Sequence, residues 1–551
     1  MSASSKKKLR NEQQAAKLTE RQLAEQKEAK KLKLYTAAFV IVLAALLIVA
    51  VVFGVSNAIS NSGTRERNTV AVTVGEHQIS NAEFNYFFID SLNNMLSGNN
   101  SYYVQLGLLD TSKPLDEQTN PMTGESWSDY MLAYATENVQ STYALVDAAK
   151  AAGYTLSEED ALTAESVITN MDMYASLYGY SDGESYLKAM YGNGADVDSY
   201  RTYVENSLLS QAYYNHYNDS LTYEDADLRV KEAENFNKYS SFTYNYYYLN
   251  TSKFQEGGTT DENGNTTYSD EEKAAAIKAA EAAAKSLVSD DITSADELDA
   301  AIAALSINAD SETDVASTLY ENNRYSNIAS PEVAEWVSVA ERKAGDMTWI
   351  ANETTSVDPE TNESVSTISG YYVLYFHSAS DNINPLKNAR HILTSFEGGS
   401  YDSNTGFTTY TDEEKAAAKT AAEDLLAQWK AGEATEESFA ALANEHSDDG
   451  DGTTGGLYAD IYPGQMVSAF EAWCFDENRK AGDTGIVETE YGYHVMYFSG
   501  NSDVTYRDYL IEQDLRSEDL NNWYTGLIEG TAVTEGDMSH VRTDIVLNSG
   551  Y

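Results

Sequence analysis

The chain has 551 residues, of which 87 are Asp or Glu and 36 are Lys or Arg, so its formal net charge is −51. Such a negative charge argues against nucleic-acid binding, because affinity there comes from cations that neutralise phosphates. The single cysteine, Cys474, excludes a disulfide scaffold and a cysteine-rich metal site. With 42% hydrophobic residues and about 100–200 residues per domain, we expect several domains, each with a buried core.

The charge is unevenly distributed along the chain. Residues 1–33 hold ten Lys/Arg and four Glu, whereas residues 34–551 carry a net charge of −57. The 22 residues at 34–55 contain no charge, and as a helix they would reach about 33 Å, enough to span a bilayer core. We therefore predict a transmembrane helix at 34–55. By the positive-inside rule, the basic tail lies in the cytoplasm and the remaining body outside the cell membrane.

The alternative interpretation of this segment is a cleaved signal peptide, with Ser56-Asn57-Ala58 as the cleavage site. The apolar core of a signal peptide is typically about 7–15 residues long, and this stretch is longer and follows a long basic tail. We therefore favour an uncleaved anchor, followed by a polar linker at 56–69.

Residues 70–240 have a mostly helical pattern. Val70–Val74 is typical of a short strand, and Ser80 or Asn81 is expected to cap the helix that follows. From there to Ser240, apolar and aromatic residues recur at three- and four-residue spacing. Such stripes usually form a core, although a module rich in Tyr and Met could instead leave a binding groove open.

The second half of the chain contains an internal repeat. EGGTTDENGNTTYSDEEKAAA, from Glu256, aligns with EGGSYDSNTGFTTYTDEEKAAA, from Glu397. ERKAGDMTWI then aligns with NRKAGDTGIV, and GYYVLYF with GYHVMYF, in the same order. Each copy runs from a strand through a polar loop and an Ala-rich helix to a closing strand. This order predicts two α+β domains of similar fold, at 241–380 and 388–499.

The two copies differ at residues that carry chemistry. Four residues of the second copy are replaced in the first: His391 by a tyrosine, taken to be Tyr247, His494 by Tyr372, Met466 by Ala329 and Phe470 by Val333. Residues 500–551 are helical again, and we expect this helix and its tail to pack on the early helices. The final HVRTDIVLNSGY is expected to form a terminal strand.

The second copy, over residues 388–499, resembles the parvulin family of peptidyl-prolyl cis–trans isomerases. The resemblance rests on an ordered set of segments: HIL, SFAALANEHSDDGDGTTGGL, PGQMVSAFEAWCF and AGDTGIVETEYGYHVMYF. It implies a four-stranded antiparallel sheet wrapped by helices, and proline-containing polypeptides as substrates.

The resemblance also assigns roles to eight residues. They form a catalytic group of His391, Asp449, Thr489 and His494, and a substrate-binding group of Tyr458, Gln465, Met466 and Phe470. In the family, the paired histidines form a core network beneath the active site, and a Cys or Asp faces the twisting amide. Met466 and Phe470 match the prolyl pocket. Tyr458 lies where a pocket wall is usually aliphatic, so we expect this wall to differ in shape.

Isomerisation of an X-Pro bond makes modest chemical demands. The barrier of about 18–20 kcal/mol comes from loss of amide resonance. An apolar socket and polar groups that favour the twisted amide suffice, so we expect no cofactor and no metal. Two acidic loops, at 261–265 and 448–452, look like calcium loops, but they lack the Gly and Glu that complete the pattern. We therefore favour solvated loops.

The whole arrangement resembles the extracytoplasmic foldases of the PrsA/SurA type, in which a helical chaperone module, completed by a C-terminal helix, accompanies parvulin domains. PrsA proteins are usually lipid-anchored, so a transmembrane anchor is a departure. We expect an isomerase and chaperone for unfolded exported polypeptides, with only the second copy active. A non-enzymatic holdase that uses both copies for client binding is the alternative, and a calcium-binding adhesion protein is a third interpretation. Whether the chain forms a homodimer is open.

Overall fold

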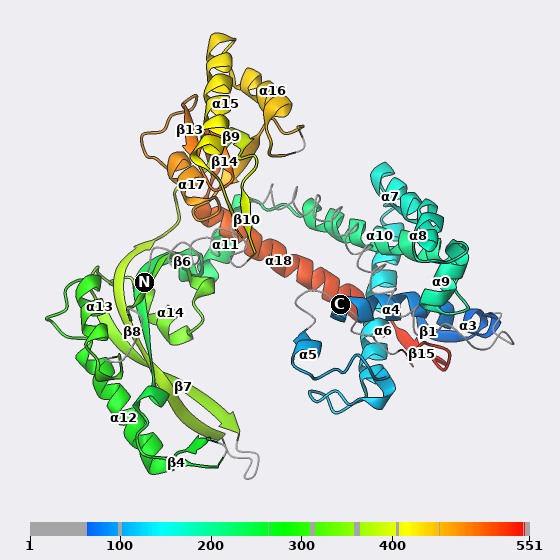
Figure 1. Ribbon diagram of the computed structural model, residues 1–551, viewed down its shortest axis with the longest axis horizontal. Coiled ribbons are helices and arrows are strands. Elements are labelled where there is room, and N and C mark those ends of the chain that lie inside the picture. Colours follow the sequence, from blue (N-terminus) through cyan, green and yellow to red (C-terminus); the bar gives the residue numbers. More distant parts are fainter. Residues whose placement is uncertain are drawn as a thin grey trace. The chain divides into compact units, whose positions relative to one another are not determined.

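The computed structural model (Figure 1) describes residues 63–96, 102–262, 264–308, 315–357, 364–403, 407–450, 452–543 and 545. The predicted tail and membrane helix, residues 1–55, lie outside this range. Within the described residues, no helix is both long and apolar enough to cross a membrane. Of these residues, 223–513 form one compact unit and 63–222 with 514–545 form another. The fold is mixed and multi-domain, with a helical N-terminal half and sheets in the C-terminal half.

The unit that contains the N-terminal half is mostly helical. Its helices are α3 (Thr64–Asn68), α4 (Asn81–Leu96), α5 (Tyr102–Gln105), α6 (Trp127–Ala151), α7 (Glu158–Thr169), α8 (Met171–Leu177), α9 (Gly183–Tyr191), α10 (Val197–Ser220) and the 3-10 helix η2 (Leu115–Glu117). α18 (Tyr506–Glu529) begins in the other unit and contributes residues 514–529 to this one. There Trp523 stacks on Tyr217 of α10, with ring centroids 3.8 Å apart.

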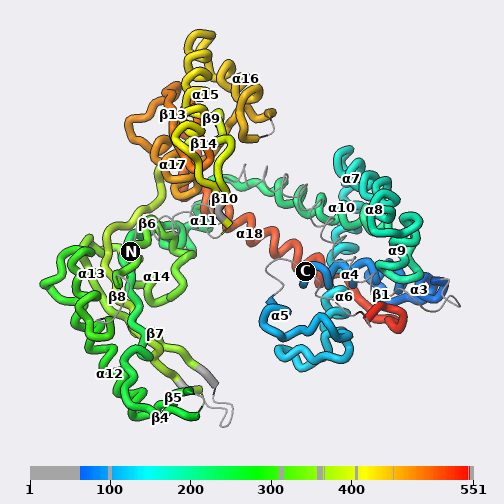
Figure 2. The backbone as a smooth tube through the Cα atoms, in the orientation of Figure 1, coloured from blue at the N-terminus to red at the C-terminus, as the bar shows by residue number. Residues whose placement is uncertain are grey.

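A small antiparallel sheet joins the two ends of the described chain. Its order is β15 (Val533–Glu535), β1 (Val70–Val74) and β2 (His77–Ser80), with Val72 opposite Glu535. Figure 2 shows the red C-terminal segment beside the blue N-terminal one. The expectation of a strand in the last twelve residues is wrong for residues 540–543, which form turns; the terminal strand lies upstream, at β15.

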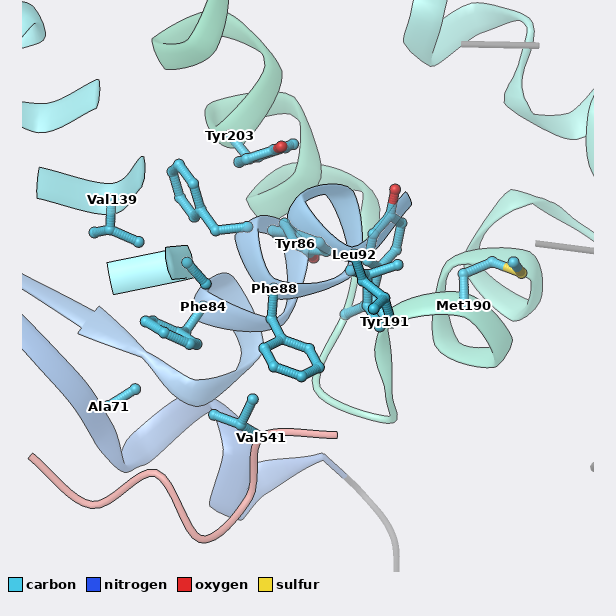
Figure 3. Packing of buried hydrophobic residues seen from close by; sticks show 14 of the residues in the cluster. Ala71, Phe84, Tyr86, Phe88, Leu92, Val139, Met190, Tyr191, Tyr203 and Val541 are labelled. Carbon is cyan, nitrogen blue, oxygen red and sulfur yellow. The ribbon is translucent and has the colours of Figure 1, made fainter. Parts of the chain in front are cut away.

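The core of the helical unit is built around α4. Ser80 caps this helix, since its Oγ accepts a hydrogen bond from Glu83 N–H at 3.2 Å. Phe84 and Phe88 of α4 are fully buried, and Val541 from the C-terminal tail packs into the same cluster (Figure 3). Each such side chain contributes about 1.5–3 kcal/mol on burial, so the tail adds to the stability of the helical core.

The other unit contains two four-stranded antiparallel sheets of the same order. The first is β6 (Thr318–Arg324), β3 (Ser241–Asn250), β8 (Ser364–Ser380) and β7 (Met347–Val357). The second is β12 (Leu457–Ile461), β9 (Pro385–Ser395), β14 (Gly492–Thr505) and β13 (Thr484–Glu488). The repeat in sequence is therefore also a repeat in topology.

Equivalent helices and short hairpins accompany the two sheets. The first has α12 (Asp270–Ser286), α13 (Ala295–Ala303), α14 (Pro331–Val337) and the hairpin β4 (Thr259–Thr260)–β5 (Thr266–Thr267). The second has α15 (Asp412–Ala431), α16 (Glu436–His446), α17 (Ser468–Cys474) and the hairpin β10 (Ser400–Asp402)–β11 (Phe407–Thr409). The remaining helix, α11 (Asp225–Glu234), precedes β3. The connections contain the short 3-10 helices η3 (Phe236–Tyr239), η4 (Thr251–Phe254), η5 (Ser306–Asn308) and η6 (Tyr325–Asn327).

The repeated sequence DEEKAAA folds in the same way in both copies. Ser269 and Thr411 cap α12 and α15, and each accepts a hydrogen bond from the backbone of a glutamate three residues on, at 3.3 Å. Those glutamates, Glu272 and Glu414, also accept the N–H of a glycine in the preceding loop, at 3.0 and 2.8 Å. The capping box and the loop are thus one local unit, which explains why they recur together.

The strand registers correct one sequence correspondence. Met496 lies opposite His391, and Leu374 lies opposite Tyr246. Because Met496 and Leu374 are equivalent in the repeated strand, the counterpart of His391 is Tyr246, and the prediction of Tyr247 was wrong by one residue. Neighbouring residues of a strand point to opposite faces of the sheet, so a shift of one residue places the side chain on the other face. Tyr247 accordingly packs in the core against α12 and α13.

Candidate active site

Two histidines meet on one face of the second sheet. His391 lies in β9 and His494 in β14, where it is opposite Leu393. Because residues two apart on a strand point to the same face, the two imidazoles lie on a diagonal of that face. Their Nδ1 atoms are 2.9 Å apart, and the side chains are buried, with 2% and 5% exposed. The sheet register therefore creates the pair.

The hydrogen-bond chain extends beyond both histidines. His494 Nε2 lies 2.9 Å from Thr489 Oγ1, and His391 Nε2 lies 3.1 Å from Asp449 Oδ2. One proton arrangement satisfies every contact with both imidazoles neutral: Thr489 donates to His494, His494 Nδ1–H to His391, and His391 Nε2–H to Asp449. In this arrangement the carboxylate of Asp449 carries the only charge, so no imidazolium has to be buried.

The charges at the two ends of this chain are set by burial and hydrogen bonding. Burial raises the pKa of Asp449, but the hydrogen bonds from His391 and the Tyr458 hydroxyl outweigh it and lower the pKa to about 2. Burial lowers the pKa of His494 to about 3. At neutral pH, Asp449 is therefore a carboxylate and His494 is uncharged.

An apolar cluster adjoins the polar chain. Met466 precedes α17 and Phe470 lies in its first half, and these side chains are 8% and 1% exposed. Together with Tyr458 they belong to one buried group beneath α17. The Phe470 ring lies 5.5 Å from each imidazole centroid, edge-on to both. Of the predicted prolyl-pocket residues, Phe470 is thus in direct contact with the histidine pair, and Met466 packs in the same apolar cluster as Phe470.

Gln465 supplies a buried donor beside this cluster. Its side chain is fully buried, and Oε1 accepts the N–H of Tyr462 at 2.8 Å. Its Nε2 has no hydrogen-bond partner among the described residues. An unpaired buried N–H costs about 1–3 kcal/mol, so this donor is an energetic exception in the site.

The loop that carries Asp449 is held by residues that sequence reasoning missed. Ser447 Oγ accepts hydrogen bonds from the N–H groups of Leu393, at 3.1 Å, and Asp449, at 3.2 Å. Arg390 donates to the carbonyl oxygens of residues 454 and 455, at 3.1 and 3.0 Å. The available signal was Arg390 itself, a cation on a strand of a chain with only 36 Lys/Arg.

Gly456 closes this loop onto β9. Its φ is +66°, and its carbonyl oxygen accepts the N–H of His391 at 2.9 Å. A Cβ at this position would lie 2.1 Å from the carbonyl oxygen of His391. Only glycine lets the loop approach the strand so closely, and the approach keeps Asp449 within reach of His391.

A cavity of about 850 Å³ lies elsewhere in this part of the chain, between α15 and the end of β9. Thr394, Leu425 and Asp448 are among its lining residues, but none of the eight predicted site residues is. Within the described residues, no three His, Cys, Asp or Glu side chains lie together as metal ligands would. Two residues of the acidic loops, Asn263 and Asp451, fall outside the described range.

The structure thus brings together the residues that the resemblance singled out. Four form the hydrogen-bonded chain, Tyr458 joins it at Asp449, and Phe470 packs against it. Met466 clusters with Phe470, and Gln465 precedes Met466 in the chain. A model of the rotamase family, described as the PPIC-type PPIase domain, matches residues 391–500. Residues 391–500 are a parvulin-type peptidyl-prolyl isomerase domain.

Solved structures similar to the chain include two PrsA peptidylprolyl isomerases and a single parvulin domain. PrsA from Bacillus cereus is 22% identical over 27% of this chain and 50% of that one, with a TM-score of 0.17. PrsA from Bacillus subtilis is 23% identical over 26% and 47%, with a TM-score of 0.17. The PPIase domain of TbPar42 is 23% identical over 20% and 98%, with a TM-score of 0.16. The chain spans about half the length of these PrsA structures, and no curated protein matches it.

Tyrosines take the place of the parvulin domain's polar chain in the first sheet. Tyr246 and Tyr372 correspond to His391 and His494, and their ring centroids are 5.5 Å apart. The row of tyrosine rings in mutual contact continues on both sides, through Tyr244, Tyr320, Tyr246, Tyr372 and Tyr248. A row of phenols has no imidazole to hold a carboxylate, so this face lacks the polar chain of the parvulin domain.

Proposed function

We propose that the chain is a membrane-anchored foldase that isomerises X-Pro bonds of exported polypeptides and holds them with its helical unit. One observation supports the catalytic part most directly: the ionised Asp449 is bound to a buried histidine pair, and the ring of Phe470, which clusters with Met466, lies edge-on to both imidazoles. A carboxylate and an apolar socket at one place are what amide rotation requires, because no covalent bond has to break.

The charge of Asp449 favours the twisted amide. In a planar amide the nitrogen lone pair is delocalised onto the carbonyl oxygen, and twisting returns that charge to nitrogen. A carboxylate near the carbonyl oxygen therefore repels the planar forms more than the twisted one, which lowers the barrier. Met466 and Phe470 hold the prolyl ring, and Gln465 lies beside Met466 in the chain. His391 and His494 keep Asp449 in position.

A proline-peptide isomerisation assay on the full chain tests this mechanism. We expect wild-type activity well above background, and a loss of at least tenfold in kcat for Asp449→Asn, since the charge that discriminates the twisted amide is removed. Met466→Ala should instead raise KM. The matched control is Ala329→Gly, at the equivalent position of the first sheet, which should leave both constants unchanged. Absence of activity in the wild type would contradict the proposal.

A holdase role for the first sheet is a second candidate function. Its tyrosine row is partly accessible, with Tyr320 37% exposed. Tyrosine offers a large apolar surface with little loss of conformational freedom on binding. Suppression of client aggregation that survives Asp449→Asn, but is weakened by Tyr320→Ala with Tyr372→Ala, would support this role. Equal suppression of client aggregation by the wild type, Asp449→Asn and the double tyrosine variant would contradict this role.

The location outside the membrane rests on the sequence of residues 1–55, with its basic tail and uncharged stretch. Slow X-Pro isomerisation, with times of about 10–100 s, limits the folding of many chains. A polypeptide that emerges unfolded from the membrane would benefit from an isomerase tethered at that site. The substrate class we propose is therefore unfolded, proline-containing exported polypeptides.

A further inference from the structure

Two donors converge on a single oxygen of Asp449. His391 Nε2 lies 3.1 Å from Oδ2, and the hydroxyl of Tyr458 donates to the same Oδ2. Among the described residues, no donor is assigned to the other oxygen, Oδ1, and 38% of the side chain is exposed. The carboxylate is thus held by one oxygen, while the other remains available to a bound chain.

Tyr458 is itself fixed on all sides. It lies in β12, opposite Ala389 of β9, and only 6% of it is exposed. Its ring stacks on the imidazole of His391, with centroids 4.6 Å apart and an interplanar angle of 28°, and lies 5.9 Å from Phe470. The sheet and the apolar cluster therefore determine where the hydroxyl lies.

Asp449, in contrast, lies in a loop that is anchored at Ser447 and at residues 454–456 and that contains Gly450 and Gly452 between these points. Gly450 follows it with φ +90°, and Gly452 has φ +74°. Glycine loses more conformational freedom on ordering than any other residue, so this loop does not fix the carboxylate by itself. A rigid donor that reaches into the loop from β12 supplies the missing constraint.

We propose that Tyr458 is a positioning residue, whose hydroxyl fixes the Asp449 carboxylate so that Oδ1 faces the amide. This inference rests on the proposed isomerase function and adds a residue to it. An aliphatic side chain at this position would also form a pocket wall but would leave Oδ2 with one donor. The free carboxylate would then sample several rotamers, only some of which lie near the reacting amide.

A double-mutant cycle on the full chain separates positioning from wall formation. Tyr458→Phe keeps the ring and removes only the hydroxyl, so we expect a fall of about tenfold in kcat with KM unchanged. In an Asp449→Asn background, the same change should cost nothing more, because the group that Tyr458 positions has lost its charge. If Tyr458→Phe lowers kcat equally in the wild-type and the Asp449→Asn backgrounds, the proposal is overturned, and Tyr458 only forms part of the pocket wall.

Tyr493→Phe is the matched control. The Tyr493 hydroxyl donates to Glu488 at 2.8 Å, so this variant also breaks a tyrosine–carboxylate hydrogen bond in the same domain. Tyr493 packs with α15 and α16, and we expect wild-type kcat and KM. A melting curve of each variant shows that the domain remains folded.

The pH profile is a further readout that a structural role would not change. The titratable groups around Asp449 are His391 from β9, Tyr458 from β12, His494 from β14 and Tyr491 from the turn before it. Removing the Tyr458 hydroxyl takes away one of the groups that lower the pKa of Asp449. The pKa then rises, and the acid limb of kcat/KM moves to higher pH.

Histidine-selective NMR makes the test independent of catalysis, since the chain has seven histidines. The His391 signal should report the protonation of Asp449 at higher pH in Tyr458→Phe than in wild type. If the wild-type chain shows no isomerase activity, the proposed function fails, but this titration still decides whether Tyr458 holds Asp449. If Tyr458→Phe leaves the pH at which Asp449 becomes protonated unchanged, the inference is overturned.

Discussion

His391 and Tyr246 occupy the same position in two sheets of the same order. Each lies on the strand next to the closing strand of its sheet. His391 contacts the ring of His494, and Tyr246 contacts the ring of Tyr372, which is the counterpart of His494. The first sheet therefore keeps the geometry of the paired rings but not their nitrogen atoms. We accordingly expect all isomerase activity of the chain to come from the second sheet.

A pair of variants checks this expectation. Asp449→Asn should remove nearly all activity of the full chain, whereas Tyr246→Phe, which alters the first sheet only, should leave kcat and KM unchanged. The physical reason is that the tyrosine row has no carboxylate held by imidazole. Substantial activity in Asp449→Asn that disappears on adding Tyr246→Phe would show that the first sheet is catalytic.

His494 should make the stability of the domain depend on pH. Its pKa is about 3 in the folded chain against 6.5 for the free side chain, so the unfolded state binds more protons between these values. The stability that a neutral buried His494 provides is therefore present above pH 6.5 and is lost progressively as the pH falls toward 3. Asp449, lowered from 3.8 to about 2, acts in the same direction at still lower pH.

The measurement is the unfolding midpoint as a function of pH. His494→Asn should flatten the decline between pH 6.5 and 3, although it lowers stability at neutral pH. His446→Asn, at the end of α16 with a side chain 36% exposed, serves as the control and should follow the wild-type curve. If the unfolding midpoint of His494→Asn falls with pH as steeply as that of the wild type, His494 is not the cause of the decline.

Gly456→Ala should damage the site through the backbone. The new Cβ would lie 2.1 Å from the carbonyl oxygen of His391, so the loop must move away from β9. Strain of this kind costs about 1–3 kcal/mol, and displacement of Asp449 lowers kcat. The control is Gly526→Ala in α18, where nothing lies within 4 Å of the added Cβ. That change should raise stability by about 0.5–1 kcal/mol, since alanine favours a helix.

Arg507 should be more important for stability than any exposed cation of its unit. It is 2% exposed, forms an ion pair with Glu232 and donates to the carbonyl oxygens of Asp381, at 3.0 Å, and Phe236, at 2.6 Å. Breaking a buried ion pair leaves a charge without its partner, so Arg507→Met should cost about 3–5 kcal/mol in denaturant unfolding.

The control for Arg507 is an exposed ion pair. Lys415 lies 3.4 Å from Glu488, with side chains 40% and 47% exposed. Lys415→Gln should cost less than about 1 kcal/mol, because water screens such a pair. If Lys415→Gln and Arg507→Met lower the free energy of unfolding by similar amounts, burial is not the reason for the effect of Arg507.

The predicted anchor can be tested by fractionation. Deletion of residues 1–55 should release the chain from the membrane fraction, because the only long uncharged stretch is lost. In intact cells stripped of their outer layers, added protease should digest the body after residue 56 and spare the basic tail. A mature N-terminus near Ile59 would instead indicate a cleaved signal peptide.

Much of the architecture follows from sequence patterns that act locally. The capping box of DEEKAAA recurs because Ser269 and Thr411 each satisfy the backbone of a residue three positions on, which needs no distant partner. Strand alternation and the repeated GYxVxYF likewise predict two similar sheets. The paired histidines and the Met466/Phe470 pair followed from their place among the family's motifs.

Register and hydroxyl partners could not be predicted in this way. Tyr246 and Tyr247 are neighbours in a run of three tyrosines, and pairing of β3 with β8 decides which one occupies the histidine position. The sequence also places Tyr458 in the pocket wall, but nothing local indicates that its hydroxyl meets Asp449, nine residues away across a glycine-rich loop.

The sequence alone determined the order of elements, the repeated fold and the identity of the candidate catalytic residues, because capping, periodicity and motif order are properties of short segments. Only the tertiary structure decided which tyrosine faces the site, that Asp449 is held by one oxygen, and that Ser447, Arg390 and Gly456 hold its loop. Those features depend on contacts between segments that are far apart along the chain. Their energies come from burial and hydrogen bonds that exist only after the strands have paired.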